Sequence, residues 1–313
     1  MMHALGIVWN PSEGIDLGFY EVHYYSLMFA TAFGLGWYLT KKIFERENEP
    51  VEKLDSLFIW TSVATMLGAR LGHVFFYDWP YYKNHLLEII LPIRETANGW
   101  KFTGFTGLAS HGATIAIIVF MYFFSKKVMK RPLLWILDRI TIPVASGAVF
   151  VRLGNFINSE IFGHATSKDA FYAIQFIEGD TYWETHNVQQ ITQASTAHKG
   201  YLLIETDPRF IEVLNQIPFR HPTQLYEAFG YIFVFLIVFY AYWKTEARQK
   251  QGLLLGLFLI LLFTVRFIVE FVKESQGGFE GDNPILSTGQ WLSIPFILTG
   301  LFLVFKARKQ VII

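Results

Sequence analysis

Long apolar stretches separated by short polar segments are the dominant pattern of this 313-residue chain. An α-helix needs roughly 20 apolar residues to cross a bilayer, and seven stretches approach that length. The pattern predicts an all-α polytopic membrane protein with seven transmembrane helices. Their expected limits are about 20–40, 55–77, 108–124, 139–158, 225–243, 252–272 and 289–306.

The distribution of lysine and arginine predicts how these helices are oriented. Basic clusters follow the first, third, fifth and seventh apolar stretches, whereas the segment before the first has none. Cytoplasmic loops carry an excess of these residues. We therefore expect the N-terminus outside the cell and the C-terminus in the cytoplasm.

Two connections on the expected outer side are too long for plain loops. Residues 78–107 are polar and aromatic, which is typical of a segment lying at the membrane interface. Residues 161–222 mix strand-like and helix-like pieces and are expected to form a small extracytoplasmic head. The predicted organisation is thus helices one to four in 1–160, the head, and helices five to seven in 223–313.

Composition supports the membrane prediction and narrows the chemistry. The chain is 52% hydrophobic and 17% charged, and the charged share lies below the quarter typical of soluble domains. Its net charge is zero, so no general attraction to nucleic acid is expected. It has no cysteine, which excludes disulfides, thiolate metal sites and a catalytic thiol of its own. Residues 1–13 lack the pattern of a cleavable signal peptide.

Ionisable side chains at membrane depth are the candidates for function, because they are costly there and usually functional. The clearest group is Arg152, Asn155 and Ser159, which share one stripe at the end of the fourth helix, with Glu160 beside them. A guanidinium group can grip two phosphate oxygens in parallel. In a membrane the commonest anion is a lipid phosphate. A polar knot between packed helices is the alternative interpretation.

Two other helices carry polar side chains at helical spacing. Arg266, Glu270 and Lys273 share one face of the sixth helix, where mutual neutralisation of Arg266 and Glu270 is the alternative. Arg70, His73 and Tyr77 share one face of the second helix, where snorkelling of Arg70 toward the interface is the alternative.

Three more residues stand at the expected outer ends of helices. His111 can be a base, a phosphate donor or an ordinary interfacial residue. Arg220 faces the headgroups or serves as an interface anchor, and Tyr25 is either part of the aromatic belt or a hydroxyl of the site. If the helices bundle, these groups converge on one cationic cavity that suits a headgroup phosphate.

Five short motifs, in this order, resemble the prolipoprotein diacylglyceryl transferases. The resemblance covers nearly the whole chain, and the third motif is the signature of that family. The motifs are Gly68-Ala69-Arg70-Leu71-Gly72, Ser110-His111-Gly112, Arg152-Leu153-Gly154-Asn155-Phe156-Ile157-Asn158 with Glu160 and Gly163, His221-Pro222-Thr223-Gln224-Leu225-Tyr226-Glu227, and Arg266 with Glu270.

The resemblance implies a reaction, its substrates and a location. Members of the family move the diacylglyceryl group of phosphatidylglycerol onto the lipobox cysteine of a preprolipoprotein signal peptide, forming a thioether and releasing glycerol phosphate. The implied location is the bacterial cytoplasmic (inner) membrane, with the active site toward the outer leaflet. Neither a cofactor nor a metal is implied, nucleic acid is not an expected partner, and we expect a monomer.

The resemblance also implies roles for the matching residues. Arg152 and Arg266 are expected to stabilise the charge on the leaving phosphate. His111 is one candidate, beside an arginine and the lipid phosphate, to accept the proton of the substrate thiol. The expected substrate contacts are Tyr25, Arg70, Asn155, Glu160, Arg220, Glu270 and Lys273.

Two other functions use the same residues differently. A transporter or channel for an anionic lipid or solute would use the arginines as a binding site, and it needs polar groups that reach both membrane faces. A membrane scaffold has no use for so many costly charges. Because the polar groups lie mainly toward the expected outer half, the transferase is the favoured hypothesis.

Overall fold

The structure, a computed structural model, describes residues 6–18, 21–96, 99–102, 107, 109–275 and 285–310, and it leaves the side chains of Ser110 and His111 undescribed. The chain forms two compact units. The larger consists of Met1–Leu39 and Asp138–Ile313, and the smaller of Thr40–Leu137.

Among the described residues, four helices are long and apolar enough to cross a membrane: Gly112–Met129, Leu133–Ile157, Thr223–Lys244 and Thr288–Arg308. The helix Leu253–Val269 is apolar but shorter. Two further long helices, α1 (Tyr24–Arg46) and α2 (Val51–Phe76), have 23 and 26 residues. They overlap the first two predicted spans, 20–40 and 55–77, but α1 continues six residues beyond its predicted end and α2 begins four residues before its predicted start. The prediction of a mostly helical membrane protein is confirmed.

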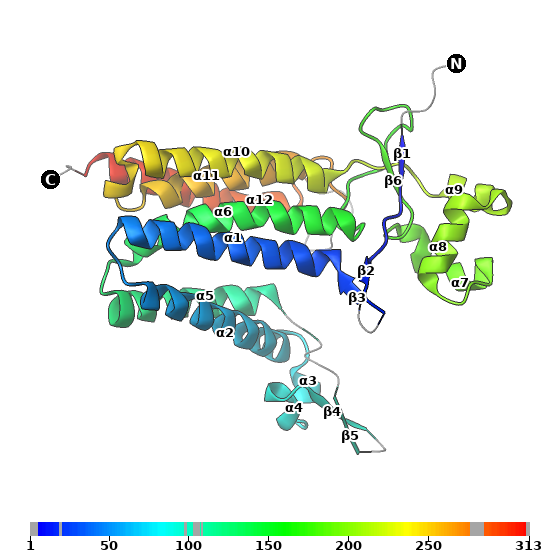
Figure 1. Ribbon diagram of the computed structural model, residues 1–313, viewed down its shortest axis with the longest axis horizontal. Helices are drawn as coiled ribbons and strands as arrows, with labels where there is room; N and C mark the ends of the chain where they lie inside the picture. Colours follow the sequence, from blue (N-terminus) through cyan, green and yellow to red (C-terminus); the bar gives the residue numbers. More distant parts are fainter. Residues whose placement is uncertain are drawn as a thin grey trace. The chain divides into compact units, whose positions relative to one another are not determined.

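In the larger unit, α1, α6 (Leu133–Ile157), α10 (Thr223–Lys244), α11 (Leu253–Val269) and α12 (Thr288–Arg308) run lengthwise alongside one another (Figure 1). Helix α11 packs against both α10 and α12.

The first turns of α6 also fix the start of α11. The fully buried Asp138 carboxylate accepts hydrogen bonds from the backbone amides of Gly252 (2.7 Å) and Leu255 (2.8 Å). It therefore satisfies amides that a helix start leaves without partners inside the helix.

Residues beyond the C-terminal end of α6 form a small mixed layer around one strand pair. Strand β1 (Ile7–Trp9) runs parallel to β6 (Ile174–Phe176), with Ile7 opposite Ile174. The Trp9 indole donates to the Phe156 carbonyl oxygen at 3.0 Å, which joins this pair to the end of α6. Three short helices lie to one side of the strands (Figure 1): α7 (Val188–Thr192), α8 (Ala197–Thr206) and α9 (Ile211–Gln216).

Two buried hydrophobic clusters form the core of this layer: one is Ile177, Val188, Ile204 and Ile217, and the other is Phe162, Ile174 and Phe176. The other elements of the larger unit are the antiparallel pair β2 (Gly14–Asp16) and β3 (Glu21–His23), and the short helices η2 (Thr181–Glu184), η3 (Pro208–Phe210) and η4 (Glu246–Gln249).

The smaller unit is built on the close packing of α2 against α5 (Ser110–Phe124). A Cβ added to Gly112 of α5 would lie 2.6 Å from the Cα of Gly72 on α2. Only glycine fits there, and small residues at such contacts are typical of helix pairs in membranes. The other elements of this unit are α3 (Trp79–Tyr82), α4 (Leu87–Ile90), the hairpin of β4 (Ile93–Thr96) and β5 (Gly99–Phe102), and the π-helical turn η1 (Ser125–Met129).

Candidate functional site

The last turns of α6 hold a chain of polar contacts. Arg152 Nη1 donates to Asn155 Oδ1 at 3.1 Å, and Asn155 Nδ2 donates to Glu160 Oε1 at 2.9 Å. Spacing of three positions places Arg152 and Asn155 on one helix face. Glu160 follows the helix, in a turn where Ser159 and Ile161 both have positive φ. This turn brings the carboxylate back onto the Asn155 amide.

Helix α10 holds that turn in place from the other side. Gln224 donates through its amide to the Glu160 carbonyl oxygen at 2.7 Å, and the Thr223 hydroxyl donates to the Ile161 carbonyl oxygen at 2.9 Å. Both α10 side chains are fully buried. The backbone around Glu160 is therefore fixed by hydrogen bonds from two helices.

A buried carboxylate from α10 pairs with two cations. Glu227, whose side chain is 1% exposed, places Oε2 2.5 Å from Arg152 Nε and Oε1 3.8 Å from Lys273 Nζ. Lys273 Nζ also lies 3.6 Å from Glu270 Oε2. Residues from the ends of α6, α10 and α11 thus form one ion-pair cluster.

Arg266, on the last turns of α11, completes this cluster. The charges of both Arg152 and Arg266 act on the Tyr231 hydroxyl and on the Lys273 ammonium group, so both guanidinium groups lie near these two side chains. The cluster, which we call the charge cluster, has three cations and three carboxylates: Arg152, Arg266, Lys273, Glu160, Glu227 and Glu270.

Tyr25 of α1 belongs to the same neighbourhood. Its ring lies against Gly154, and its hydroxyl interacts with the Asn155 side chain and with the charges of Glu160 and Arg152. Seven predicted site residues therefore lie in or beside the charge cluster. They are Tyr25, Arg152, Asn155, Glu160, Arg266, Glu270 and Lys273.

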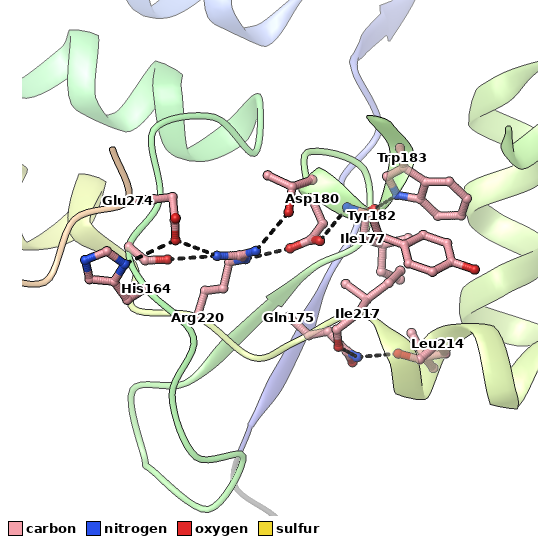
Figure 2. A network of polar contacts seen from close by, with 12 residues as sticks. His164, Gln175, Ile177, Asp180, Tyr182, Trp183, Leu214, Ile217, Arg220 and Glu274 are labelled. Atoms are coloured by element: carbon pink, nitrogen blue, oxygen red, sulfur yellow. Dashed lines mark hydrogen bonds and ion pairs between the residues drawn. The ribbon is translucent and has the colours of Figure 1, made fainter. Parts of the chain in front are cut away.

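Arg220 lies in a separate polar network just before α10 (Figure 2). Its Nε is 2.5 Å from Asp180 Oδ2 and its Nη1 is 3.0 Å from Glu274 Oε2. Its guanidinium carbon lies 4.7 Å from the centre of the Phe162 ring. Arg220 is buried, and it ties the segment after α11 to the small mixed layer.

Two imidazoles flank the Arg220 network. His164 Nδ1 lies 3.2 Å from Glu274 Oε2 (Figure 2). His221 stacks on Tyr172, with ring centres 5.0 Å apart. Burial lowers the pKa of His221 below its ordinary value, and the nearby His164 adds to this effect.

Arg70 of the smaller unit caps a short helix. Its Nε donates to the Ile89 carbonyl oxygen at 3.1 Å, and its Nη2 donates to the Glu88 carbonyl oxygen. Its guanidinium carbon lies 4.7 Å from the centre of the Tyr82 ring. Carbonyl groups at a helix end have no partners within the helix, so Arg70 attaches α4 to α2.

His111 lies in the first turn of α5, and its side chain is outside the described residues. For metals, one group among the described residues has suitable spacing. Glu13, Glu21 and His23 place ligand atoms within 4.8 Å of one another. All three side chains are exposed, and we assign no metal to them.

Sequence reasoning assigned no role to Glu227, although it noted the residue within a motif. The signal was available, because Glu227 is an ionisable residue inside an apolar helix. Asp180 and Glu274, the partners of Arg220, were also missed, since they lie in polar segments where carboxylates are ordinary.

Comparison with known proteins adds an independent line of evidence. The family model described as prolipoprotein diacylglyceryl transferase matches residues 13–306. A phosphatidylglycerol–prolipoprotein diacylglyceryl transferase of Chloroherpeton thalassium is 37% identical over 97% of this chain and 95% of its own length. Proteins with the same name from Tolumonas auensis and Bacteroides fragilis are each 35% identical, over 97% and 98% of this chain and 98% and 97% of their own lengths. The chain therefore belongs to the prolipoprotein diacylglyceryl transferase family.

Proposed function

We propose that this protein transfers the diacylglyceryl group of phosphatidylglycerol to the lipobox cysteine thiol of a preprolipoprotein signal peptide. The thiol sulfur bonds to the glyceryl carbon, the bond from that carbon to the phosphate oxygen breaks, and glycerol phosphate leaves. The thiol proton passes to a base. The products are a thioether-linked lipid on the peptide and free glycerol phosphate.

The charge cluster is the observation that carries this proposal. Phosphate charge grows as the carbon–oxygen bond breaks, and guanidinium groups fixed in advance stabilise such charge. Arg152 and Arg266 come from different helices, yet the charges of both act on Tyr231 and Lys273. A phospholipid headgroup suits this arrangement, because its phosphate is an anion that guanidinium groups bind in parallel.

The other predicted site residues receive supporting roles. Tyr25, Asn155, Glu160, Glu270 and Lys273 position the arginines or the lipid headgroup, in keeping with their contacts inside the charge cluster. His111 accepts the thiol proton, as an imidazole can near neutral pH.

For Arg70 and Arg220 we propose an indirect role in substrate entry, through the segments they hold. Backbone carbonyl groups engage Arg70, and carboxylates engage Arg220.

The proposed setting is the cytoplasmic (inner) membrane, with seven helices, an external N-terminus, and residues 161–222 as an extracytoplasmic head. Catalysis takes place toward the outer leaflet, by a monomer. Support for this setting comes from the basic loops and from the long helices of both units.

A mass assay tests the reaction. The purified protein, mixed with phosphatidylglycerol vesicles and a synthetic lipobox peptide, is expected to raise the peptide mass by one diacylglyceryl unit. A peptide with serine in place of the lipobox cysteine should gain no mass, because it lacks the nucleophile. An unmodified cysteine peptide, with a related transferase active in parallel, would contradict the proposal.

Replacement of Arg152 tests the site. Arg152→Ala removes a group expected to stabilise the leaving phosphate, and loss of one such donor typically costs about 10²–10³ in rate. The matched control is Arg209→Ala, because Arg209 is 78% exposed and pairs with Asp207 two positions away. Folded Arg152→Ala protein that turns over as fast as the control would remove Arg152 from the site.

A further inference from the structure

Glu227 is enclosed to a degree that is unusual for a carboxylate. Glu227 lies one turn into α10 and is fully buried. The cations that pair with its carboxylate are Arg152 and Lys273. A carboxylate buried at membrane depth is costly unless cations offset it. Both of its close cations belong to the charge cluster.

The Arg152 guanidinium is held in place before any lipid arrives. Glu227 lies 2.5 Å from Nε, and Asn155 Oδ1 accepts from Nη1 at 3.1 Å. The Tyr231 hydroxyl, one turn after Glu227 on α10, also lies near the Arg152 guanidinium group. Long arginine side chains have substantial rotamer freedom, and these contacts remove it.

Glu227 also determines the charge that a phosphate meets. Without its carboxylate, the charge cluster would hold three cations against two carboxylates. An anion would then bind more tightly before the reaction, in the ground state. Tighter binding of substrate alone does not accelerate the chemical step.

These observations lead to one inference, which rests on the proposed function. We propose that Glu227 is a positioning residue for diacylglyceryl transfer: it fixes Arg152 and Lys273 around the lipid phosphate and weakens their hold on it before the reaction. It acts through Arg152 and does not contact the reacting atoms.

Steady-state kinetics of Glu227→Gln and Glu227→Asp test this role. Glutamine is nearly isosteric but neutral, so kcat is expected to fall at least tenfold while KM for phosphatidylglycerol stays equal or falls. Aspartate keeps the charge and should restore part of kcat. A fall in kcat that merely follows the folded fraction, with no rescue by aspartate, would overturn the proposal.

A double variant tests whether Glu227 acts through Arg152. If it does, adding Glu227→Gln to Arg152→Gln should cost little further rate, because effects of coupled residues are not additive. If the rate loss of the double variant equals the product of the losses in the two single variants, the residues act independently and the proposed role is contradicted.

Asp138→Asn is the matched control, since Asp138 is another buried carboxylate. It precedes Arg152 by 14 residues on α6, which is about 21 Å at 1.5 Å per residue. This substitution should lower the unfolding temperature and leave KM unchanged.

A binding measurement separates this inference from the proposed function. Phosphatidylglycerol binding without peptide can be measured by native mass spectrometry, and Glu227→Gln is expected to bind it about three- to tenfold more tightly than the unmodified protein. If the unmodified protein transfers nothing but this difference is seen, the transferase proposal fails and the control of anion binding by Glu227 stands. Equal or weaker binding by Glu227→Gln would overturn the inference whatever the turnover.

Discussion

Arg152 and Arg266 differ in how the protein uses their guanidinium groups. Arg152 is engaged by Glu227 and Asn155. Arg266 Nε is buried and has no hydrogen-bond partner among the described residues. A buried donor without a partner costs free energy, so a phosphate oxygen that reaches this nitrogen gains more than one that competes for Arg152. In the proposed reaction we therefore expect a phosphate oxygen to engage Arg266 before it engages Arg152.

Gly289 offers a way to displace a carboxylate of the charge cluster without removing it. A Cβ added at Gly289 of α12 would lie 2.7 Å from Glu270 Oε2. The carboxylate ends a flexible side chain, so it should move away from Lys273, which now lies 3.6 Å away. We expect Gly289→Ala to lower kcat about tenfold to hundredfold, since small misplacements have such effects.

The control for this prediction is Gly34→Ala in α1, where no described atom lies within 4 Å of the added Cβ. Steady-state kinetics and thermal unfolding of both variants make the comparison. Gly289→Ala should unfold within about 3 °C of the unmodified protein. Unchanged kcat in Gly289→Ala would show that the position of Glu270 does not matter for turnover.

The sequence located single residues of the charge cluster but not their partners. Arg152 and Asn155 were correctly placed on one helix face, where they are in contact, because a spacing of three positions fixes neighbours on a helix. Glu227 lies 75 positions after Arg152 in the chain, on another helix, and helical periodicity says nothing about which residues of two helices meet. The choice of partner across helices depends on packing, which a single sequence does not display.

Arg70 shows how one side chain can join elements. It reaches from α2 to the carbonyl groups at the end of α4, and the buried Glu88 carboxylate accepts from the Tyr81 hydroxyl and the Glu95 amide, both at 2.8 Å. Together these contacts join α2, α3, α4 and β4. The prediction of an interfacial segment at 78–107 did not include such a tether.

The junction before α10 should respond to pH through His221. Its pKa is lowered by burial and by His164, so the folded state binds its proton less readily than the unfolded state. This difference in proton affinity contributes to the free energy of unfolding. Its contribution is complete above 6.5, the ordinary pKa of histidine, and is lost as the pH falls through the lowered pKa of His221. Between pH 7.5 and 5.5, the unmodified protein should therefore lose unfolding temperature relative to His221→Gln.

Thermal unfolding of both proteins across this pH range measures the difference between their unfolding temperatures. The contributions of the other titrating groups cancel in this difference, because both proteins contain them. A difference independent of pH would contradict the lowered pKa. Because the variant also loses the stacking on Tyr172, a constant offset between the two curves is expected and carries no information about titration.

Helix boundaries were predicted well where the charged residues lie at the ends of a helix, and less well where charged residues lie inside it. The fifth and seventh predicted spans lie within two residues of α10 and α12 at each end. Helix α6 begins at Leu133, six residues before its prediction, because Asp138 and Arg139 resemble loop residues in sequence. In the structure both are buried: Asp138 caps α11, and Arg139 donates to the Arg248 carbonyl oxygen at 3.1 Å.

The orientation of the whole molecule can be tested cleanly because the chain contains no cysteine. Single cysteines can replace the exposed residues Thr206, Glu246 and Lys309. A maleimide that cannot cross membranes should label Thr206→Cys in intact cells. Glu246→Cys and Lys309→Cys should need permeabilised membranes.

The unmodified protein is the blank for this labelling, since it has no thiol. Labelling of Lys309→Cys in intact cells would reverse the proposed orientation. Labelling of Thr206→Cys only after permeabilisation would place the α7–α9 layer on the cytoplasmic side.

The pairing of β1 with β6 has a consequence for how the protein is made. Trp9 lies opposite Phe176 of β6, which follows about 167 positions later in the chain, and ribosomes add about 5–20 residues per second. The first strand must therefore wait about 8–33 s for β6 to be synthesised, with its apolar side chains unpaired. The β1–β6 pair therefore closes late in the synthesis of the protein. The layer around it is completed only when β6 has left the ribosome, long after β1.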